Sequence, residues 1–392
     1  MNAIEMSLLA RRLDAICGEM GAILRRSAIS PNIRDRGDYS CALFDGQGEL
    51  VAQAAHIPVH LGSMAFAMAQ VVRHVDWAEV DVMLFNDPFL GGTHLPDITV
   101  VMPVVEAGQL LGFAASRAHH ADVGGKSPGS MGLHCQLEDE GVVISPGFWW
   151  RKGVEQRQHL QEFLQRARNP QERMADLSAQ RAACMAGLRR LLALQSESPL
   201  AERFAQLMLV SERYGRNAVA AIPDGVYAYA DWLEDDGLGN GPLAICLRLE
   251  ISGDEAIIDF TGSSAQTDGP VNCSLAVTAA SVFYVFRCLM PAETPQSAAV
   301  FRPLHLKVEE GSMLHARRGA AVAGGNVETS QRIVDVLLGA LAQALPQRIP
   351  AASQGTMNNV IFGSKNWVYY ETLGGGMAHR RHATGRVPFS AT

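Results

Sequence analysis

Hydrophobic and polar positions along the first third of the chain predict a helix followed by antiparallel hairpins. Residues 1–27 carry apolar side chains mainly at three- and four-residue steps, which is typical of an amphipathic helix. Two apolar runs, 98–105 and 110–118, flank the segment Glu106-Ala-Gly-Gln109. This arrangement predicts two antiparallel strands joined by a four-residue loop.

The rest of the pattern predicts a mixed α/β protein of the α+β class. Long stretches rich in Ala, Arg and Leu are helical in period, and apolar runs bounded by turn residues are strand-like. The further predicted helices are 62–74, 156–168, 171–194, 200–221, 274–289 and 330–344, and the further predicted strands are 39–44, 49–54, 82–85, 227–233, 243–251, 256–260 and 367–371. We divide the chain into a hairpin region (1–147), a helical segment (148–222) and a second α/β region (223–392).

The register of the hairpin at 98–118 brings polar residues together at its open end. If Val105 pairs with Leu110, then Pro96 lies opposite His119. Partners across a ladder share a face and neighbours along a strand alternate, so His120 lies on the other face from His119.

His94 and Asp97 are expected beside His119 in this hairpin. His94 shares the face of His119, and Asp97 is free to turn toward either histidine because Pro96 interrupts the ladder. Lone histidines are usually surface residues or hydrogen-bonded core residues. Two imidazoles and a carboxylate converging beside glycines instead favour a metal site with mixed nitrogen and oxygen ligands, suited to zinc, manganese or iron.

Longer motifs resemble one known family. The segments NDPFLGGTHLPDITVV, from Asn86, and SRAHHADVGGKSPGSM, from Ser116, are similar to the signature of the hydantoinase B and oxoprolinase family. That family includes N-methylhydantoinase B and the large metal-carrying subunits of acetone carboxylases. The similarity covers nearly the whole chain, because it continues in NIRDRGDYSCALFD from Asn32, PDGVYAYADWLEDDG from Pro223, DFTGSSAQTDGPVNCS from Asp259 and FRPLHLKVEEGSML from Phe301.

The resemblance implies a fourth metal ligand. An aspartate beside glycine is most commonly a turn or capping residue, and this is one interpretation of Asp38. In the family, however, the aspartate of this Asp-aromatic-Ser-Cys motif looks like a metal ligand. The predicted ligands of a divalent transition metal are therefore Asp38, His94, Asp97 and His119.

Four nearby residues are expected to support the chemistry. His120 is predicted to be an orienting neighbour, and Asp122 is predicted to move a proton, so these two are the candidate catalytic residues. His56 and His60 are predicted to line the pocket or to orient ligands through hydrogen bonds.

The resemblance implies a metal-dependent subunit of an ATP-dependent hydrolase that acts on cyclic amides of the hydantoin or 5-oxoproline type. A hydantoinase A-type partner would phosphorylate the ring carbonyl oxygen, and the metal would lower the pKa of the water that opens the activated ring. The sequence contains no GxxxxGK[ST] loop, so ATP is expected on the partner. The alternatives are a subunit of an acetone-type carboxylase, in which the metal would stabilise an enolate, and an inactive scaffold.

Composition excludes other classes of partner. The 392 residues suffice for two or three domains, and 48% of them are hydrophobic. A net charge of -7, without a basic cluster, argues against nucleic acid or an anionic membrane as partner. The sequence contains no transmembrane run and no signal-peptide pattern. Seven cysteines without a CxxC spacing favour reduced thiols in a cytoplasmic protein.

The end of the chain departs from the family pattern. The similarity extends to Gly374-Gly-Gly-Met377, and the segment 378–392 is basic and free of motifs. We interpret this segment as the product of a truncation or frameshift. The third region is therefore expected to be cut short, with reduced solubility and activity.

Overall fold

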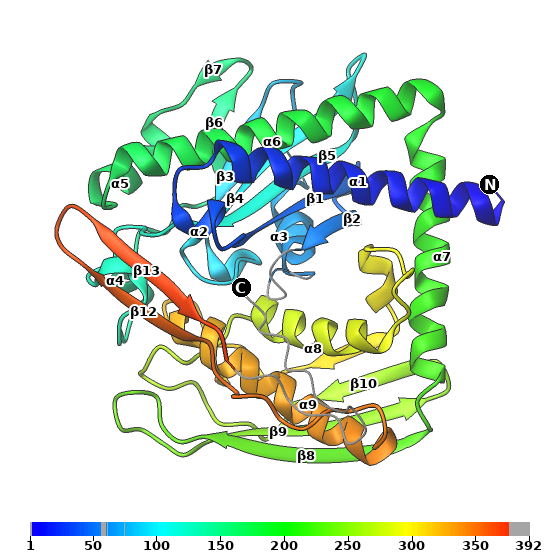
Figure 1. The fold of residues 1–392 in the computed structure, drawn as a ribbon, viewed down its shortest axis with the longest axis vertical. Helices are drawn as coiled ribbons and strands as arrows, with labels where there is room; N and C mark the ends of the chain where they lie inside the picture. Colours follow the sequence, from blue (N-terminus) through cyan, green and yellow to red (C-terminus); the bar gives the residue numbers. More distant parts are fainter. Residues whose placement is uncertain (1, 56–59, 61, 74, 376–392) are drawn as a thin grey trace.

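A seven-stranded sheet carries the first half of the fold (Figure 1). The computed structural model describes residues 2–55, 60, 62–73 and 75–375. The strand order in this sheet is β2-β1-β5-β4-β3-β6-β7, and all neighbours are antiparallel. Its strands are β1 (Tyr39–Asp45), β2 (Leu50–Ala55), β3 (Val82–Phe85), β4 (Asp97–Glu106), β5 (Gln109–His119), β6 (Gly147–Arg151) and β7 (Val154–Glu155).

Helices cover both faces of this sheet. On one face, α1 (Ala3–Ser27) and α6 (Pro170–Glu197) pack against each other and against the strands (Figure 1). On the other face lies α3 (Ser63–Val71). Side chains alternate along each strand, so Val100 belongs to the core under α1 and α6, whereas Val101 belongs to the core under α3.

A second, four-stranded sheet forms the other half, in the order β11-β10-β9-β8. Helices α8 and α9 pack together and share the core of this sheet. Helix α8 also contacts α3, where Phe283 stacks on Phe66 with ring centroids 6.4 Å apart. The elements of this half are β8 (Gly225–Leu233), β9 (Leu243–Ser252), β10 (Glu255–Asp259), α8 (Leu275–Leu289), β11 (Leu304–Lys307) and α9 (Ser330–Ala344), and α7 (Leu200–Ala220) leads into it.

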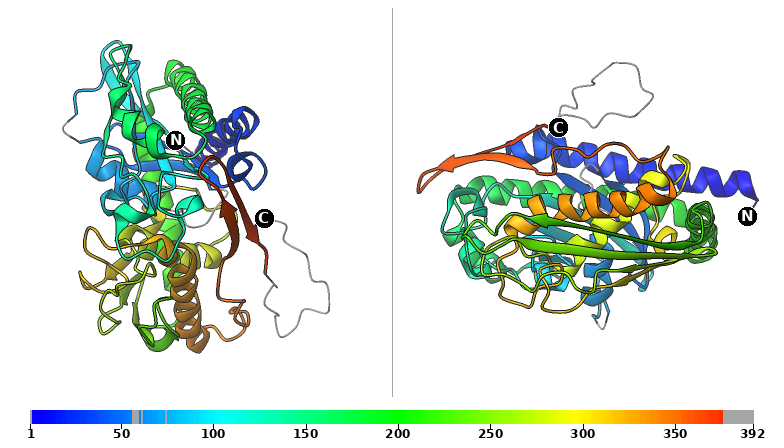
Figure 2. Two further views of the ribbon diagram at one scale, coloured as in Figure 1. Left: turned by 90° about the vertical axis from the view of Figure 1, so that its left-hand side faces the viewer. Right: turned by 90° about the horizontal axis from the view of Figure 1, so that it is seen from below.

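A separate two-stranded hairpin lies on the outside of the molecule (Figure 2). It consists of β12 (Asn358–Gly363) and β13 (Val368–Leu373), and it packs against the short turn η3 (Pro128–Ser130). The remaining short elements are α2 (Pro31–Arg34), η2 (Pro88–Leu90), α4 (Leu137–Glu140), α5 (Gln158–Arg166), η4 (Ala298–Phe301) and the π-helix η5 (Gly325–Thr329).

The α+β class predicted from the pattern is confirmed, and the strand predicted at 82–85 has the predicted ends. Two details differ from the prediction. Glu106 pairs with Gln109, so the hairpin loop has two residues rather than four. Strand β12 is absent from the predicted strands, because it begins with two polar asparagines and its partner β13 comes later in the chain.

The helical segment 148–222 and the hairpin region 1–147 share one hydrophobic core. Strand β6 pairs with β3, and α6 lies across β4 and β5, so the predicted boundary after residue 147 falls within β6. The predicted C-terminal segment 378–392 lies outside the described residues, as do His56 and His74.

A buried carboxyl group joins the two halves of the fold. Glu140, at the end of α4, accepts hydrogen bonds at Oε1 from the backbone N–H groups of Val322, at 2.9 Å, and Ala323, at 2.8 Å. Its Oε2 atom has no hydrogen-bond partner among the residues that the structure describes. Burial raises the pKa of Glu140 to about 8, despite the two backbone hydrogen bonds, which lower it.

We expect Glu140 to make stability fall as the pH rises. Between its ordinary pKa of 4.5 and the raised pKa of about 8, the folded state holds a proton that the unfolded state releases. Its contribution is therefore complete below pH 4.5 and is lost as the pH rises through 8, with a slope of at most about 1.4 kcal/mol per pH unit. Glu140→Gln should remove this slope, and the exposed neighbour change Glu138→Gln should keep it. Urea unfolding from pH 5 to 8.5 tests this, and equal slopes in the wild type and Glu140→Gln would contradict it.

Candidate metal centre

A β-bulge sets the position of Asp97 in the hairpin of β4 and β5. Val105 pairs with Leu110 as predicted, but the register shifts by one residue immediately before Val105. Asp97, rather than Pro96, therefore lies directly opposite His119. The predicted register was wrong at this end, because the bulge adds a residue to β5, and a strand that is buried on both faces has no alternation of polar and apolar residues that would reveal it. The shift brings a carboxylate, instead of a proline ring, to face the imidazole.

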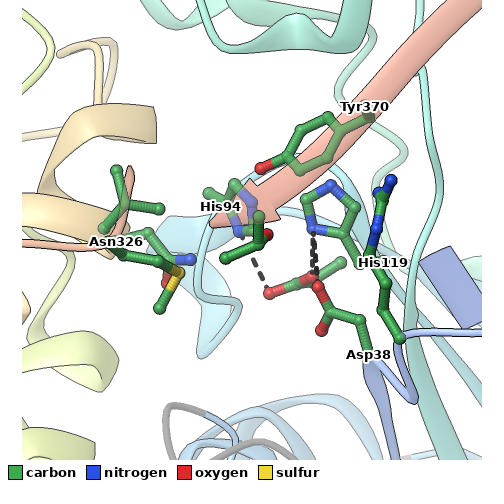
Figure 3. Close-up of a pocket in the computed structure, with 10 residues that line it drawn as sticks. Asp38, His94, His119, Asn326 and Tyr370 are labelled. Carbon is green, nitrogen blue, oxygen red and sulfur yellow. Dashed lines mark ion pairs between the residues drawn. The ribbon is translucent and has the colours of Figure 1, made fainter. Parts of the chain in front are cut away.

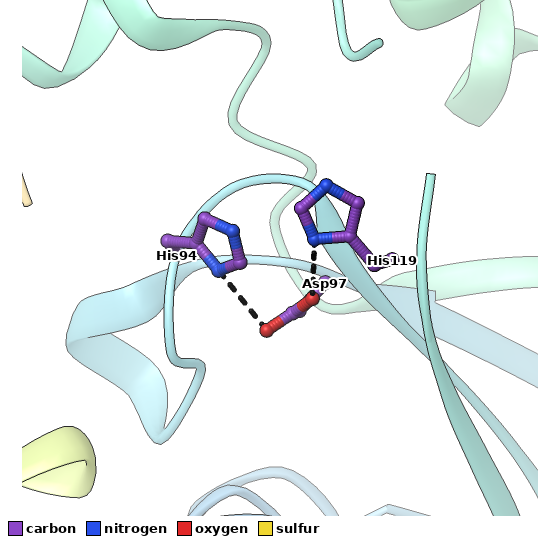
Figure 4. Close-up of side chains that lie close together, drawn as sticks. All are labelled: His94, Asp97 and His119. Atoms are coloured by element: carbon purple, nitrogen blue, oxygen red, sulfur yellow. Dashed lines mark ion pairs between the residues drawn. The ribbon is translucent and has the colours of Figure 1, made fainter. Parts of the chain in front are cut away.

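Asp97 lies between two histidines (Figure 4). Its Oδ2 atom is 3.0 Å from Nδ1 of His94, and its Oδ1 atom is 3.4 Å from Nδ1 of His119. All three side chains are buried, and one donor atom from each lies within 4.8 Å of the other two. Asp38 lies at the edge of this group, with its Oδ2 atom 3.7 Å from Nδ1 of His119. The structure thus brings all four predicted ligands together, three closely and Asp38 at the rim.

His60 and Thr93 hold the carboxylate from behind. Nε2 of His60 is 3.2 Å from Oδ2 of Asp97, and Nδ1 of His60 is 3.0 Å from Oγ of Ser40. The Thr93 hydroxyl donates to the same Asp97 oxygen. His60 therefore contacts the Asp97 carboxylate directly, and with Asp38 and Asp97 it forms a second group whose donor atoms lie within 4.8 Å of one another.

The charges in this cluster favour an ionised Asp97. Burial alone would raise the pKa of Asp97, but the neighbouring imidazoles of His94 and His60 hold it well below its usual range. Burial alone would also lower the pKa of His119, but the carboxylates of Asp38 and Asp97 raise it. Asp97 is thus kept in the form that binds a metal ion.

Several buried atoms of the cluster lack a hydrogen-bond partner within the described part of the chain. They are both ring nitrogens of His94, Nε2 of His119 and Oδ1 of Asp97, although Nδ1 of His94 and Oδ1 of Asp97 lie within ion-pair distance of their neighbours in the cluster. Buried polar atoms are normally hydrogen-bonded, so the two Nε2 atoms, which have no contact of either kind, require an explanation. Two imidazoles and a carboxylate are also the donor set that zinc, manganese and iron accept. The residues present therefore fit a divalent transition metal.

His120 and Asp122 point away from this cluster. Nε2 of His120 is 2.9 Å from Oε1 of Gln180 on α6, across the sheet from His119, and burial lowers the pKa of His120 to about 4. The Asp122 carboxylate accepts hydrogen bonds from three backbone N–H groups, those of Gly124, Gly129 and Arg168, and, at 2.8 Å, from the guanidinium of Arg168. Neither residue lines the cavity beside the cluster. These contacts do not support the proton transfer predicted for Asp122.

A cavity of about 120 Å3 opens beside the cluster (Figure 3). The Tyr370 ring of β13 packs edge-on against the His119 ring with centroids 5.1 Å apart, and the Arg36 guanidinium lies 5.5 Å from the centre of the Tyr370 ring. Asn326 of η5 lies on the opposite side of the cavity (Figure 3). The lining residues are Arg36, Asp38, His94, Asp97, His119, Asn326, Val327, Met357, Tyr370 and Thr372.

The sequence is similar to proteins of several organisms along almost its full length. An uncharacterised protein of Methanocaldococcus jannaschii is 38% identical, and the match covers 96% of this chain and 68% of that protein. 5-Oxoprolinase 1 of Arabidopsis thaliana is 37% identical, over 96% of this chain and 31% of its own length. The B-type subunit of a putative D-/L-hydantoinase of Pseudomonas sp. is 27% identical, over 97% of this chain and 68% of its own.

Two solved structures share the fold. The ATP-dependent caprolactamase from Pseudomonas jessenii has a TM-score of 0.88 and 27% identity, over 95% of this chain and 66% of its own. A nucleotide-free acetone carboxylase has a TM-score of 0.85 over 96% of this chain and 54% of its own, and at 17% identity it shows the fold alone. This chain thus spans about a third to about two thirds of the proteins it resembles.

The family resemblance identified from the motifs is confirmed by these comparisons. Within the described ranges, every helix is too short or too polar to cross a membrane. The sequence matches the family described as Hydantoinase B/oxoprolinase over residues 2–389. One relative bears the name of a subunit, which implies a partner chain for that protein. The fold, the relatives and the family match agree, and the chain belongs to the hydantoinase B/oxoprolinase family.

Proposed function

We propose that this chain is the metal-carrying subunit of an ATP-dependent hydrolase that opens cyclic amides of the hydantoin or 5-oxoproline type. The observation that carries the proposal is the buried group of His94, Asp97 and His119, in which Nε2 of each histidine lacks a partner among the described residues and which forms one wall of a cavity. The relatives named 5-oxoprolinase and caprolactamase support the choice of a ring amide as substrate.

The residues of the cluster have distinct roles in this proposal. A divalent transition metal held by His94, Asp97 and His119 would act as a Lewis acid and lower the pKa of water. Asp38, at the rim, would complete the ligand set. His60 fixes the position of the Asp97 carboxylate through the 3.2 Å contact at Oδ2, as residues behind metal ligands commonly do.

The cavity supports a small, partly polar substrate. Its volume of about 120 Å3 suits a single ring better than a polymer. Val327 and Met357 provide apolar surface, whereas Arg36 and Asn326 provide polar groups. Arg36 places a cation at the cavity wall, which would favour an anionic substrate or a phosphorylated ring.

ATP is assigned to a hydantoinase A-type partner. The sequence lacks the Gly-rich loop with Lys and Ser or Thr that grips phosphates in many ATP-binding proteins. The relative named as one subunit of a hydantoinase supports the need for a second chain. All seven cysteines are free thiols, which supports a reducing compartment such as the cytoplasm.

We expect ring opening only when this chain and the ATP-binding subunit are present together. The isolated chain should not hydrolyse ATP, because no phosphate-binding loop is present. The two subunits should be co-expressed and supplied with ATP and hydantoin, 5-oxoproline or caprolactam, and the ring-opened acid should be measured by mass spectrometry. Each subunit alone serves as the control. ATPase activity that follows the purified isolated chain would contradict the assignment of ATP to the partner.

Because this chain shares its fold with an acetone carboxylase, a carboxylase subunit is the second candidate function. The same co-expressed subunits should therefore be given acetone, bicarbonate and ATP. Carboxylation of acetone without opening of any ring would replace the proposed hydrolase by a carboxylase. Absence of bound metal, together with absence of both reactions, would favour an inactive scaffold.

A further inference from the structure

Asn326 brings an unpaired amide to the cavity from the other half of the fold. Figure 3 shows it across the cavity from Asp38 and His119. The residue is 4% exposed, and its Oδ1 atom has no hydrogen-bond partner among the described residues. A buried acceptor without a partner is unfavourable, so its position at a cavity wall points to a ligand that supplies the donor.

The backbone around Asn326 is held closely in place. A Cβ atom on Gly325 would lie 1.9 Å from the carbonyl oxygen of Asn272, so only glycine permits this approach. The Gly325 N–H donates to the Pro270 carbonyl at 2.9 Å, and the Asn326 carbonyl accepts from the Ser330 hydroxyl at 2.7 Å. Asn326 also lies in a π-helix, a rare conformation that is frequently found at functional sites. The side chain is thus presented from a fixed backbone.

The shape of an asparagine amide matches a ring amide. A small ring forces the N–H and C=O groups of its amide onto the same side, whereas an open-chain secondary amide is almost always trans. The Oδ1 and Nδ2 atoms of Asn326 can therefore form two parallel hydrogen bonds with a ring amide and only one at a time with an open-chain amide. The Thr372 hydroxyl, which also lines the cavity, already donates to Asn359 at 2.8 Å.

We propose that Asn326 is a specificity-determining residue that binds the amide group of a cyclic amide, an inference that rests on the proposed hydrolase function. Val327 and Met357 line the cavity beside it, so water competes poorly for the same hydrogen bonds. A site built to pair an N–H group also rejects analogues that lack this group, because its own acceptor is then left unpaired.

The test compares δ-valerolactam with cyclohexanone, a ring of the same size without the N–H group. Each ligand is titrated with the full chain loaded with Zn2+, and binding is followed by ligand-observed NMR. The titrations are done with the wild type, Asn326→Leu and Asn326→Ala. We expect each variant to bind δ-valerolactam about tenfold more weakly, and to bind cyclohexanone within about twofold of the wild type. Zinc content should stay unchanged, because Asn326 is not a proposed ligand. Asn358→Leu, at an exposed position outside the cavity wall, should change neither affinity.

Each outcome separates this inference from the proposed function. Equal δ-valerolactam affinity in the wild type and both Asn326 variants overturns the inference, and the proposed function survives if the co-expressed subunits still open rings. A parallel loss for δ-valerolactam and cyclohexanone also overturns it, because the role of Asn326 would then be general packing. A zinc-loaded wild type that binds no δ-valerolactam overturns the inference and leaves ring opening by the two subunits as the separate test of function.

Discussion

His119→Ala is expected to empty the metal site and abolish ring opening together. The wild type should carry about one transition-metal ion per chain, and the variant should keep only two of the three close donors, His94 and Asp97. Loss of a residue that merely orients a ligand typically costs 10- to 100-fold in metal affinity or activity, so loss of a ligand should cost about 100-fold or more. Elemental analysis gives the occupancy, and the ring-opening assay with the partner gives the activity.

The matched control for His119→Ala is His305→Ala. The His305 side chain is 50% exposed and lies 3.5 Å from Glu255 on the second sheet, away from the cavity. This variant should keep its metal. His94→Ala should behave like His119→Ala, and circular dichroism should show unchanged secondary structure in all three variants. Full metal occupancy in both His94→Ala and His119→Ala would contradict the proposed metal site.

Gly91→Ala is expected to destabilise the fold by about 3 kcal/mol or more, because the added Cβ atom is unfavourable in a left-handed backbone conformation and would clash with α3. Gly91 has a φ of +84°, and a Cβ atom there would lie 2.2 Å from the backbone nitrogen of Ala67 in α3. Backbone atoms cannot move aside as a flexible side chain can. The Gly91 carbonyl also accepts from the buried guanidinium of Arg117 at 3.2 Å, and the loop continues to His94. The variant should therefore also lose metal.

Gly108→Ala isolates the conformational part of this effect. Gly108 lies in the tight turn of the hairpin with a φ of +80°, and a Cβ atom there would have nothing within 4 Å. Its substitution should cost about 1 kcal/mol and leave the metal in place. Urea unfolding of the two variants measures the difference. Equal destabilisation of Gly91→Ala and Gly108→Ala would show that the approach to α3 is not tightly packed.

The local half of the site follows from the sequence. Side chains alternate along a strand, and this rule alone places His119 toward His94 and Asp97 and His120 toward α6, as observed. The pairing of Asp97 with His119 could not be predicted, because β5 is buried on both faces and its continuous apolar run does not show where a bulge adds a residue. The ion pair of Asp122 with Arg168 could not be predicted either, because Arg168 lies 46 residues later in the chain.

The other half of the site could not be predicted from local patterns. Asn326 and Tyr370 reach the cavity from η5 and β13, more than 200 residues after His119 in the chain. Their position depends on how α8, α9 and the β12–β13 hairpin pack against the first sheet. Periodicity predicts which face of an element is buried, but it does not specify which distant element covers that face.

The bulge before Val105 makes the length of the hairpin part of its chemistry. Counting from the loop, β5 uses one more residue than β4 to reach the open end, and this extra residue decides whether Asp97 or Pro96 faces His119. If a single residue were deleted within β4 and the bulge kept, Pro96 would replace Asp97 opposite His119. Every residue of the cluster would still be present, but the carboxylate would no longer face the imidazole. A designer who transfers this hairpin to another sheet must therefore preserve the unequal strand lengths as strictly as the residues of the cluster.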